Sequence, residues 1–266
     1  MGGRGGRAKG SSGPRKIAGP LAGSPFLTHI GLHQDRVVQG VHPFTISVLE
    51  NGLDLTLDSP ITFLVGENGS GKSTLLEGLA WALGYGAQGG ARSNAYAEGA
   101  DGHALGRALA LSWRQRVSDG FFLRAETFFN FATYLEEVGS SFRAYGGKSL
   151  HQQSHGEAFL ALFQNRFEDG IYLLDEPEAA LSPARQLAFL RILHDLSASK
   201  CAQFIVATHS PILLTFPGST VLLLEGGQIR PVPYQDTEHF RLTRGFLEAP
   251  ERFYRFLLAD DDEEKA

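Results

Sequence analysis

The chain contains little cysteine and no long apolar run. Only one of its 266 residues is a cysteine, which excludes a disulfide framework and a thiolate metal cluster within one subunit. We expect this residue, Cys201, to be a small buried side chain at the start of a strand, in a reducing compartment. No stretch approaches the roughly 20 apolar residues of a membrane span, so we expect a cytoplasmic protein without membrane insertion.

The chain also lacks an excess of positive charge, since 24 Lys and Arg stand against 29 Asp and Glu. This formal balance of −5 argues against a protein that coats nucleic acid through bulk positive charge. Residues 1–24 are basic, rich in glycine and free of acidic side chains, and they lack the apolar core of a secretory signal. We therefore predict a disordered basic tail at 1–24, a folded body over 25–258 and an acidic tail at 259–266.

A local basic region is still present within the folded body. Five arginines contribute to it: Arg92, Arg107, Arg114, Arg116 and Arg124. They either form the solvated face of a helix or follow the phosphates of a nucleic acid, and in the second case DNA should stimulate the activity at low salt.

Three short apolar runs predict strands that are buried in a mainly parallel sheet. Residues 61–65 lead into a glycine-rich loop and then into a helix with apolar side chains at helical spacing. The runs over 171–174 and 204–207 flank a second helix, which begins at Pro183. These strand–helix units indicate an α/β fold.

Alternating apolar residues on both sides of Asn51-Gly52 predict that an antiparallel hairpin, formed by 44–48 and 53–57, opens the folded part. Residues 84–150 have weaker periodicity, and we expect an insertion there in the form of a short helical subdomain.

The C-terminal segment 240–258 contains Pro250, a plausible helix start, and three phenylalanines on one face: Phe246, Phe253 and Phe256. We expect this segment to pack onto the domain as a helical hairpin.

The glycine-rich loop fits the pattern G-x-x-x-x-G-K-[ST] over Gly66–Ser73, in the required place between a strand and a helix. Its glycines let several backbone N–H groups point at one place, and the helix N-terminus adds partial positive charge. We expect Lys72 to neutralise the β- and γ-phosphates of a nucleotide and the Ser73 hydroxyl to ligate Mg²⁺.

Two further motifs lie at the ends of the predicted strands. Asp175 and Glu176 follow an apolar run, so the first carboxylate can hold Mg²⁺ through water and the second can act as general base. His209 comes just after the run over 204–207, at the sheet edge where ligands bind in open α/β folds, and we expect it to sense the γ-phosphate.

Ser154-His-Gly-Glu157 precedes a helix and forms a capping box in which Ser154 is the N-cap. The same helix N-terminus, entered through small residues, is also suited to bind a γ-phosphate. His151 and His155 are spaced i, i+4, but because no third ligand is evident we reject a zinc site there.

Together these motifs resemble those of the ABC-type ATPase superfamily. The loop corresponds to its Walker A motif, Ser154–Glu157 to a variant of its signature, Asp175-Glu176 to its Walker B motif and His209 to its switch histidine. Over 25–258 the chain is similar to a family of stand-alone ATPases, often labelled AAA and related to the overcoming-lysogenization-defect and recombination-repair ATPases. The motifs that carry this closer resemblance are Phe121–Glu126, Tyr145–Leu150, Asp175–Pro183 and Asp236–His239.

The resemblance implies a P-loop NTPase fold of ABC type that binds ATP and Mg²⁺ and hydrolyses the ATP. It implies nucleotide contacts at Gly66, Glu67, Asn68, Gly69, Ser70, Gly71, Lys72, Ser73, Thr74, Ser154 and Gly156. It assigns catalysis to Lys72, Glu176 and His209, and Mg²⁺ binding to Ser73, Asp175 and Glu126. Glu126 stands where the superfamily often has a glutamine, and Phe44 is a weak candidate for stacking on adenine.

The resemblance also implies an ATP-dependent homodimer in which the Ser154 region of one subunit covers the nucleotide held by the other. Three functions fit such a dimer: a switch acting on a protein or nucleic-acid partner, the nucleotide-binding subunit of a transporter, and a slow-hydrolysing scaffold in a defence system. Only 81 positions separate Lys72 from Ser154, which excludes a long coiled-coil arm between them.

Overall fold

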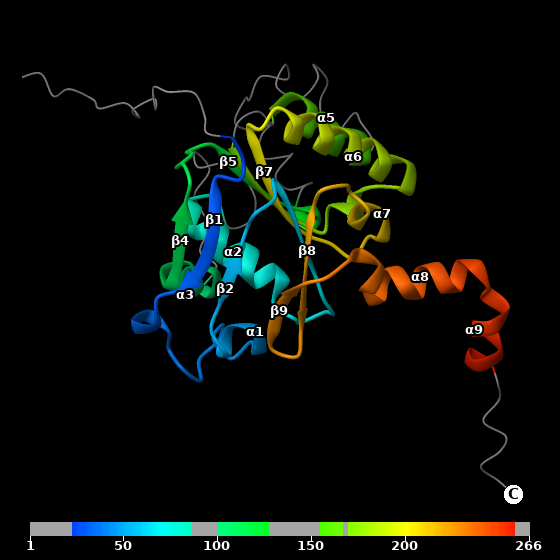
Figure 1. The fold of residues 1–266 in the computed structure, drawn as a ribbon, viewed down its shortest axis with the longest axis horizontal. Helices are drawn as coiled ribbons and strands as arrows, with labels where there is room; N and C mark the ends of the chain where they lie inside the picture. The colour runs from blue at the N-terminus through cyan, green and yellow to red at the C-terminus, as the bar shows by residue number, and fades with distance from the viewer. Residues whose placement is uncertain (1–22, 87–99, 128–154, 167–169, 259–266) are drawn as a thin grey trace, which may run out of the picture.

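The computed structural model describes residues 23–86, 100–127, 155–166 and 170–258. The two predicted tails, Arg92, His151 and Ser154 lie outside the described residues, apart from the last two residues of 1–24. Within them the chain forms two sheets with helices packed around them (Figure 1).

The larger sheet has six strands in the order β5-β6-β7-β3-β8-β9, and all neighbours are parallel except β8 and β9. Its strands are β3 (Ile61–Val65), β5 (Gly120–Arg124), β6 (Gly170–Asp175), β7 (Ala202–Ala207), β8 (Thr220–Glu225) and β9 (Gln228–Pro231). Every residue of β3, β6 and β7 is buried, which confirms the predicted α/β class with a mainly parallel sheet.

Helices cover both faces of this sheet because its strands present apolar side chains on both sides. Phe159, Phe163 and Phe189 pack on one face, from α5 (His155–Arg166) and α6 (Pro183–Ala198). On the other face lies α2 (Lys72–Leu83), together with α3 (Ala100–Ala108). The remaining helices are α1 (Ser47–Glu50), α7 (Pro211–Leu214), α8 (Glu238–Glu248), α9 (Pro250–Leu257) and the 3-10 turns η1 (Gln34–Arg36), η3 (Ala125–Thr127), η6 (Pro177–Ala180) and η7 (Tyr234–Asp236).

The smaller sheet is antiparallel, and it corrects the predicted hairpin. Its order is β2 (Asp54–Thr56), β1 (Leu27–Leu32), β4 (Leu109–Trp113), so β2 pairs with β1 and not with residues 44–48. Phe44, Val48 and Leu49 are all buried, a spacing that fits the short helix α1 better than a strand.

The segment 84–150 contributes to both sheets, because β4 belongs to the smaller one and β5 is an edge strand of the larger one. The parts of this segment at 87–99 and 128–150 lie outside the described residues. Cys201 comes directly before β7 but is only half-buried, so the expectation of a buried cysteine was wrong.

The C-terminal helices differ from the expected packing. Pro250 begins α9 as predicted, but α8 and α9 extend away from the two sheets (Figure 1), and neither contains a buried residue. Phe246 contacts Phe253 and Tyr254 within this pair of helices, while Phe256 is 86% exposed. Among the described residues no helix is long and apolar enough to cross a membrane.

Gln203 on β7 connects the N-terminal segment to the larger sheet. Its side chain is fully buried, its Oε1 accepts from the N–H groups of Phe26 and Leu27, and its Nε2 donates to the Leu27 carbonyl. A buried N–H without a partner costs about 1–3 kcal/mol, so these three bonds hold β1 beside β7.

Substitution Gln203→Leu should lower the free energy of unfolding by roughly 3 kcal/mol, because it leaves two buried N–H groups and one carbonyl without partners. Chemical denaturation of both proteins measures this loss. Gln228→Leu, at an exposed position on β9, is the control and should change stability by less than about 0.5 kcal/mol. A loss below about 1 kcal/mol for Gln203→Leu would contradict the assigned role.

Candidate functional site

The glycine-rich loop joins β3 to α2 and can be formed only by glycine at several of its positions. Gly69 and Gly71 have φ values of 80° and 99°, in the left-handed region. A Cβ on Gly66 would lie 2.5 Å from the Leu224 carbonyl, and one on Gly71 would lie 2.8 Å from Cγ2 of Ile46. The loop therefore forms a narrow backbone cradle at the N-terminus of α2.

The Lys72 side chain folds back over this cradle. Its buried ammonium group donates to the carbonyl oxygens of Gly66 at 2.7 Å and Glu67 at 2.9 Å. Burial lowers the pKa of Lys72, while Glu176, Asp175 and Glu178 act in the opposite direction. The cation is thus held within the loop, where it can meet the phosphate groups of a nucleotide.

Asp175 ends β6 and is almost completely buried. Its Oδ1 accepts from the Ser73 hydroxyl at 3.1 Å and its Oδ2 accepts from Nε of Arg124 at 3.1 Å. Burial raises the pKa of Asp175, whereas Arg124 and the Ser73 hydrogen bond lower it. Ser73 and Asp175 present adjacent oxygen ligands, the type that Mg²⁺ prefers, so this pair fits the predicted metal site.

Arg124 also donates to Oε1 of Glu77 on α2, at 2.5 Å. It therefore links β5, β6 and α2, a role that the sequence analysis missed when it grouped Arg124 with the other arginines of the basic region. The sequence signal was only that Arg124 ends an apolar run, since its alignment with Asp175 comes from the parallel register of β5 and β6. Arg107, Arg114 and Arg116 are exposed.

Glu176 follows with φ of 50°, a left-handed conformation that is rare for residues other than glycine. Its N–H donates to the Ala207 carbonyl at 2.9 Å, and its half-exposed carboxylate lies 3.4 Å from Nε2 of His209. This Nε2 is buried and makes no hydrogen bond with any described residue. Glu176 and His209 thus meet beside the glycine-rich loop with unused hydrogen-bonding capacity.

His209 is held by two residues that the sequence analysis did not assign to the site. Its N–H donates to Oε1 of Glu178 at 2.5 Å, and burial raises the pKa of Glu178. Its ring meets that of His239, the second residue of α8, edge to edge, with centroids 4.6 Å apart and Nδ1 of His209 in contact with Nε2 of His239. The motifs that contain Glu178 and His239 were recognised, but neither residue was given a role.

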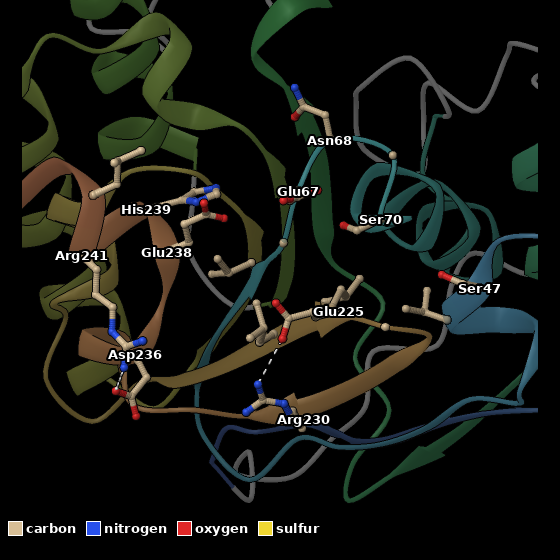
Figure 2. A pocket seen from close by; sticks show the side chains of 18 of the residues that line it. Ser47, Glu67, Asn68, Ser70, Glu225, Arg230, Asp236, Glu238, His239 and Arg241 are labelled. Carbon is tan, nitrogen blue, oxygen red and sulfur yellow. Dashed lines mark hydrogen bonds and ion pairs between the residues drawn. The ribbon is translucent and has the colours of Figure 1, made fainter. Parts of the chain in front are cut away.

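A cavity of about 880 Å³ opens beside the loop. Figure 2 shows Glu67, Asn68 and Ser70 of the loop on one side and Glu238 and His239 of α8 on another. Two ion pairs lie around it, Glu225 with Arg230 at 3.2 Å and Asp236 with Arg241 at 2.5 Å. The Ser70 hydroxyl is buried and has no partner among the described residues, so it is available to a ligand.

The remaining predicted site residues are placed as follows. Thr74 continues α2 and is half-buried, next to Ser73. Glu126 is exposed on η3, which packs beside η6, and its role as a metal ligand stays a prediction. Phe44 is 3% exposed within the core, so it cannot stack on adenine in this conformation.

Gly156 lies in the first turn of α5 and packs against its own chain. A Cβ at this position would be 2.6 Å from Cδ of Arg185 and 3.1 Å from the Ala180 carbonyl. Glu157 forms an ion pair with Arg185 at 3.2 Å. No three His, Cys, Asp or Glu side chains form a metal-binding cluster in the described part of the chain.

Comparison with known proteins identifies two segments. Residues 37–109 match the family described as "AAA domain", and residues 157–215 match the family described as "AAA domain, putative AbiEii toxin, Type IV TA system". The first contains the glycine-rich loop with Lys72 and Ser73, and the second contains Asp175, Glu176 and His209.

The chain is also 39% identical over 72 residues to protein ea59 of Escherichia phage lambda. This match covers 25% of the chain and 14% of ea59, so the chain spans about one seventh of that relative.

The fold is similar to those of ABC ATPases and of the head domains of structural-maintenance-of-chromosomes proteins. The SMC head domain from Thermotoga maritima has 17% identity and a TM-score of 0.44, over 78% of this chain and 98% of that one. An ATP-binding cassette of an ABC transporter has 14% identity and a TM-score of 0.47, over 85% of this chain and 98% of that one.

The pKa of His209 is lowered to about 4, because burial and then the charge of Lys72 disfavour the imidazolium form. We predict that the ring is neutral from pH 8 down to about 5 in the nucleotide-free protein and takes up a proton only at lower pH. NMR titration of the ring, assigned with His209→Gln, measures this. A midpoint near the ordinary value of about 6.5 would contradict the described environment of the ring.

Proposed function

We propose that this chain is a Mg²⁺-dependent ATPase of the ABC type. The observation that carries the proposal is the meeting of five side chains at the carboxyl ends of β3, β6 and β7, where open α/β sheets bind ligands. They are Lys72, Ser73, Asp175, Glu176 and His209.

The loop and Lys72 would bind the triphosphate. Glycine at positions 66, 69 and 71 leaves the backbone N–H groups accessible, and the helix dipole of α2 favours negative charge at this end. The Lys72 ammonium would exchange its two carbonyl partners for phosphate oxygens. This exchange is favourable because a charged acceptor bonds more strongly than a neutral carbonyl.

Ser73 and Asp175 would hold Mg²⁺, which when bound neutralises charge on the phosphate oxygens. Burial raises the pKa of Asp175, and Arg124 opposes this effect through a charge-assisted hydrogen bond that favours the carboxylate form. On binding the metal, the Ser73 hydroxyl would lose its hydrogen bond to Oδ1 of Asp175.

Glu176 would act as general base on the attacking water. Its carboxylate is half-exposed, unlike the buried Asp175, and lies beside His209, whose buried Nε2 lacks a hydrogen bond among the described residues. A donor on this nitrogen would hold the γ-phosphate in line with that water.

The ATP-dependent dimer stays part of this proposal. The start of α5 packs against η6 and α6 of its own chain, and no described residue of α5 lines the 880 Å³ cavity. Ser154 and Gly156 would therefore meet the nucleotide of a second copy rather than their own.

For the biological output we propose a switch that acts on an unidentified protein or nucleic-acid partner. The toxin–antitoxin description of the family matched by 157–215 and the phage origin of ea59 favour a defence scaffold as second candidate. The two candidates predict different effects of DNA at low salt. DNA should stimulate ATP hydrolysis by a switch that acts on DNA, but not by a slow scaffold.

Hydrolysis tests the assigned residues. Wild-type protein should release phosphate from ATP only with Mg²⁺. Glu176→Gln should reduce the rate by at least about 100-fold, because the base is lost while the side-chain shape is retained. The control Glu251→Gln, at an exposed position on α9, should keep the wild-type rate. Equal rates for Glu176→Gln and wild type would contradict the proposed base.

Sedimentation tests the dimer. Glu176→Gln should be monomeric alone and dimeric with saturating ATP and Mg²⁺, because bound ATP is no longer hydrolysed. Adding Lys72→Ala to this variant should abolish the dimer by removing phosphate binding. A monomer at saturating ATP, with binding confirmed by calorimetry, would contradict the shared site.

A further inference from the structure

We propose that His239 is a positioning residue that donates a hydrogen bond to His209 and thereby fixes the proton of His209 on Nε2, facing the reacting phosphate. This inference rests on the proposed function, because it concerns how the γ-phosphate sensor is prepared for that reaction.

The two imidazole rings lie so that one nitrogen of each takes part in the contact between them. The two ring planes differ by only 15°, and the rings meet edge to edge, so that Nε2 of His239 contacts Nδ1 of His209. The other nitrogen of His209, Nε2, lies 3.4 Å from Oε1 of Glu176. The two nitrogens of His209 therefore face different partners, a ring nitrogen and a carboxylate.

Proton counting then selects one tautomer. A contact between two neutral imidazoles holds one proton, so either His239 Nε2–H donates to His209 Nδ1 or the reverse. If His209 carried its proton on Nδ1, the bare lone pair of its Nε2 would face the Glu176 carboxylate. A donor on Nε2 is attracted by that carboxylate and by a phosphate, so the first arrangement is favoured.

Both rings are in an environment that keeps them neutral. Burial and then the charge of Lys72 lower the pKa of His239, as they do for His209, while Glu238 and Glu67 act in the opposite direction. The contact between the two neutral rings therefore contains a single proton. The direction of this hydrogen bond decides which nitrogen of His209 is protonated.

The position of His239 is itself fixed by the start of α8. Thr237, the preceding N-cap residue, is fully buried, and its hydroxyl donates to the Tyr234 carbonyl at 2.7 Å. His239 lines the 880 Å³ cavity on the side that α8 forms (Figure 2). The start of α8 therefore determines the tautomer of His209. This part of the chain is distant in sequence from the glycine-rich loop.

NMR of the nucleotide-free protein tests the hydrogen bond directly. In ¹⁵N-histidine-labelled protein, a scalar coupling across the N–H···N bond should join the two rings, with the proton attached to Nε2 of His239. A proton on Nδ1 of His209, or no coupling at a pH where both rings are neutral, would overturn the inference. This readout needs no ATP, so it remains decisive if the hydrolysis assay fails.

Kinetics separates positioning from a structural role. His239→Phe keeps an aromatic ring at this position but removes the donor, and we expect kcat to fall at least about tenfold while KM for ATP stays within about twofold. His239→Gln places an N–H near the former Nε2 and should recover most of the lost rate. Melting temperatures of both variants check that they fold.

Two results would count against the positioning role. If His239→Phe keeps kcat within about twofold of wild type, the donor is not needed. If His239→Phe and His239→Gln are equally slow and equally destabilised, His239 only packs against the site. An inactive wild-type protein would instead refute the proposed function, and the NMR result would still decide the tautomer.

Discussion

The burial of one carboxylate at the end of a strand is the constraint on which the site depends. Asp175 is 4% exposed, and an uncompensated charge there would cost several kcal/mol. Its two oxygens are satisfied from two directions, by Ser73 at the start of α2 and by Arg124 at the end of β5. Arg124 in turn is held by Glu77 on α2. The charge of Asp175 thus fixes where the glycine-rich loop, the edge strand β5 and the strand β6 stand relative to one another.

The balance of charge around this carboxylate explains why a divalent cation belongs to the proposed reaction. Three carboxylates lie at the end of β6 and in the turn that follows it, at Asp175, Glu176 and Glu178, while the described cations beside them are Lys72 and Arg124. A triphosphate entering this turn meets net repulsion that two cations do not offset, and one of these is already used by Asp175. In the proposed reaction Mg²⁺ would supply the missing positive charge, held by the oxygens of Ser73 and Asp175.

Local patterns in the sequence predicted the parts of the site that lie on short segments. The loop, the buried runs and the acids after β6 were found because strand, glycine and helix signals are encoded within a few neighbouring residues. Arg124, Glu178 and His239 were missed as site residues, since their partners lie on other elements and only the parallel register and the start of α8 bring them together.

The antiparallel sheet was paired wrongly for the same reason, because Asn51-Gly52 indicates a turn but not which strand the chain returns to. The packing of the C-terminal helices was also wrong, as apolar spacing predicts an apolar face but not what covers it.

The central claim is that Ser73 and Asp175 hold the metal while Lys72 and His209 hold the terminal phosphate. A crystal structure of Glu176→Gln with ATP and Mn²⁺, in which anomalous scattering locates the metal, tests it most directly. The account predicts the metal peak between the Ser73 hydroxyl and Asp175, with the Lys72 ammonium moved from the loop carbonyls to phosphate oxygens and Nε2 of His209 at the γ-phosphate. A metal or triphosphate bound elsewhere, with Lys72 still bonded to Gly66 and Glu67, would contradict it.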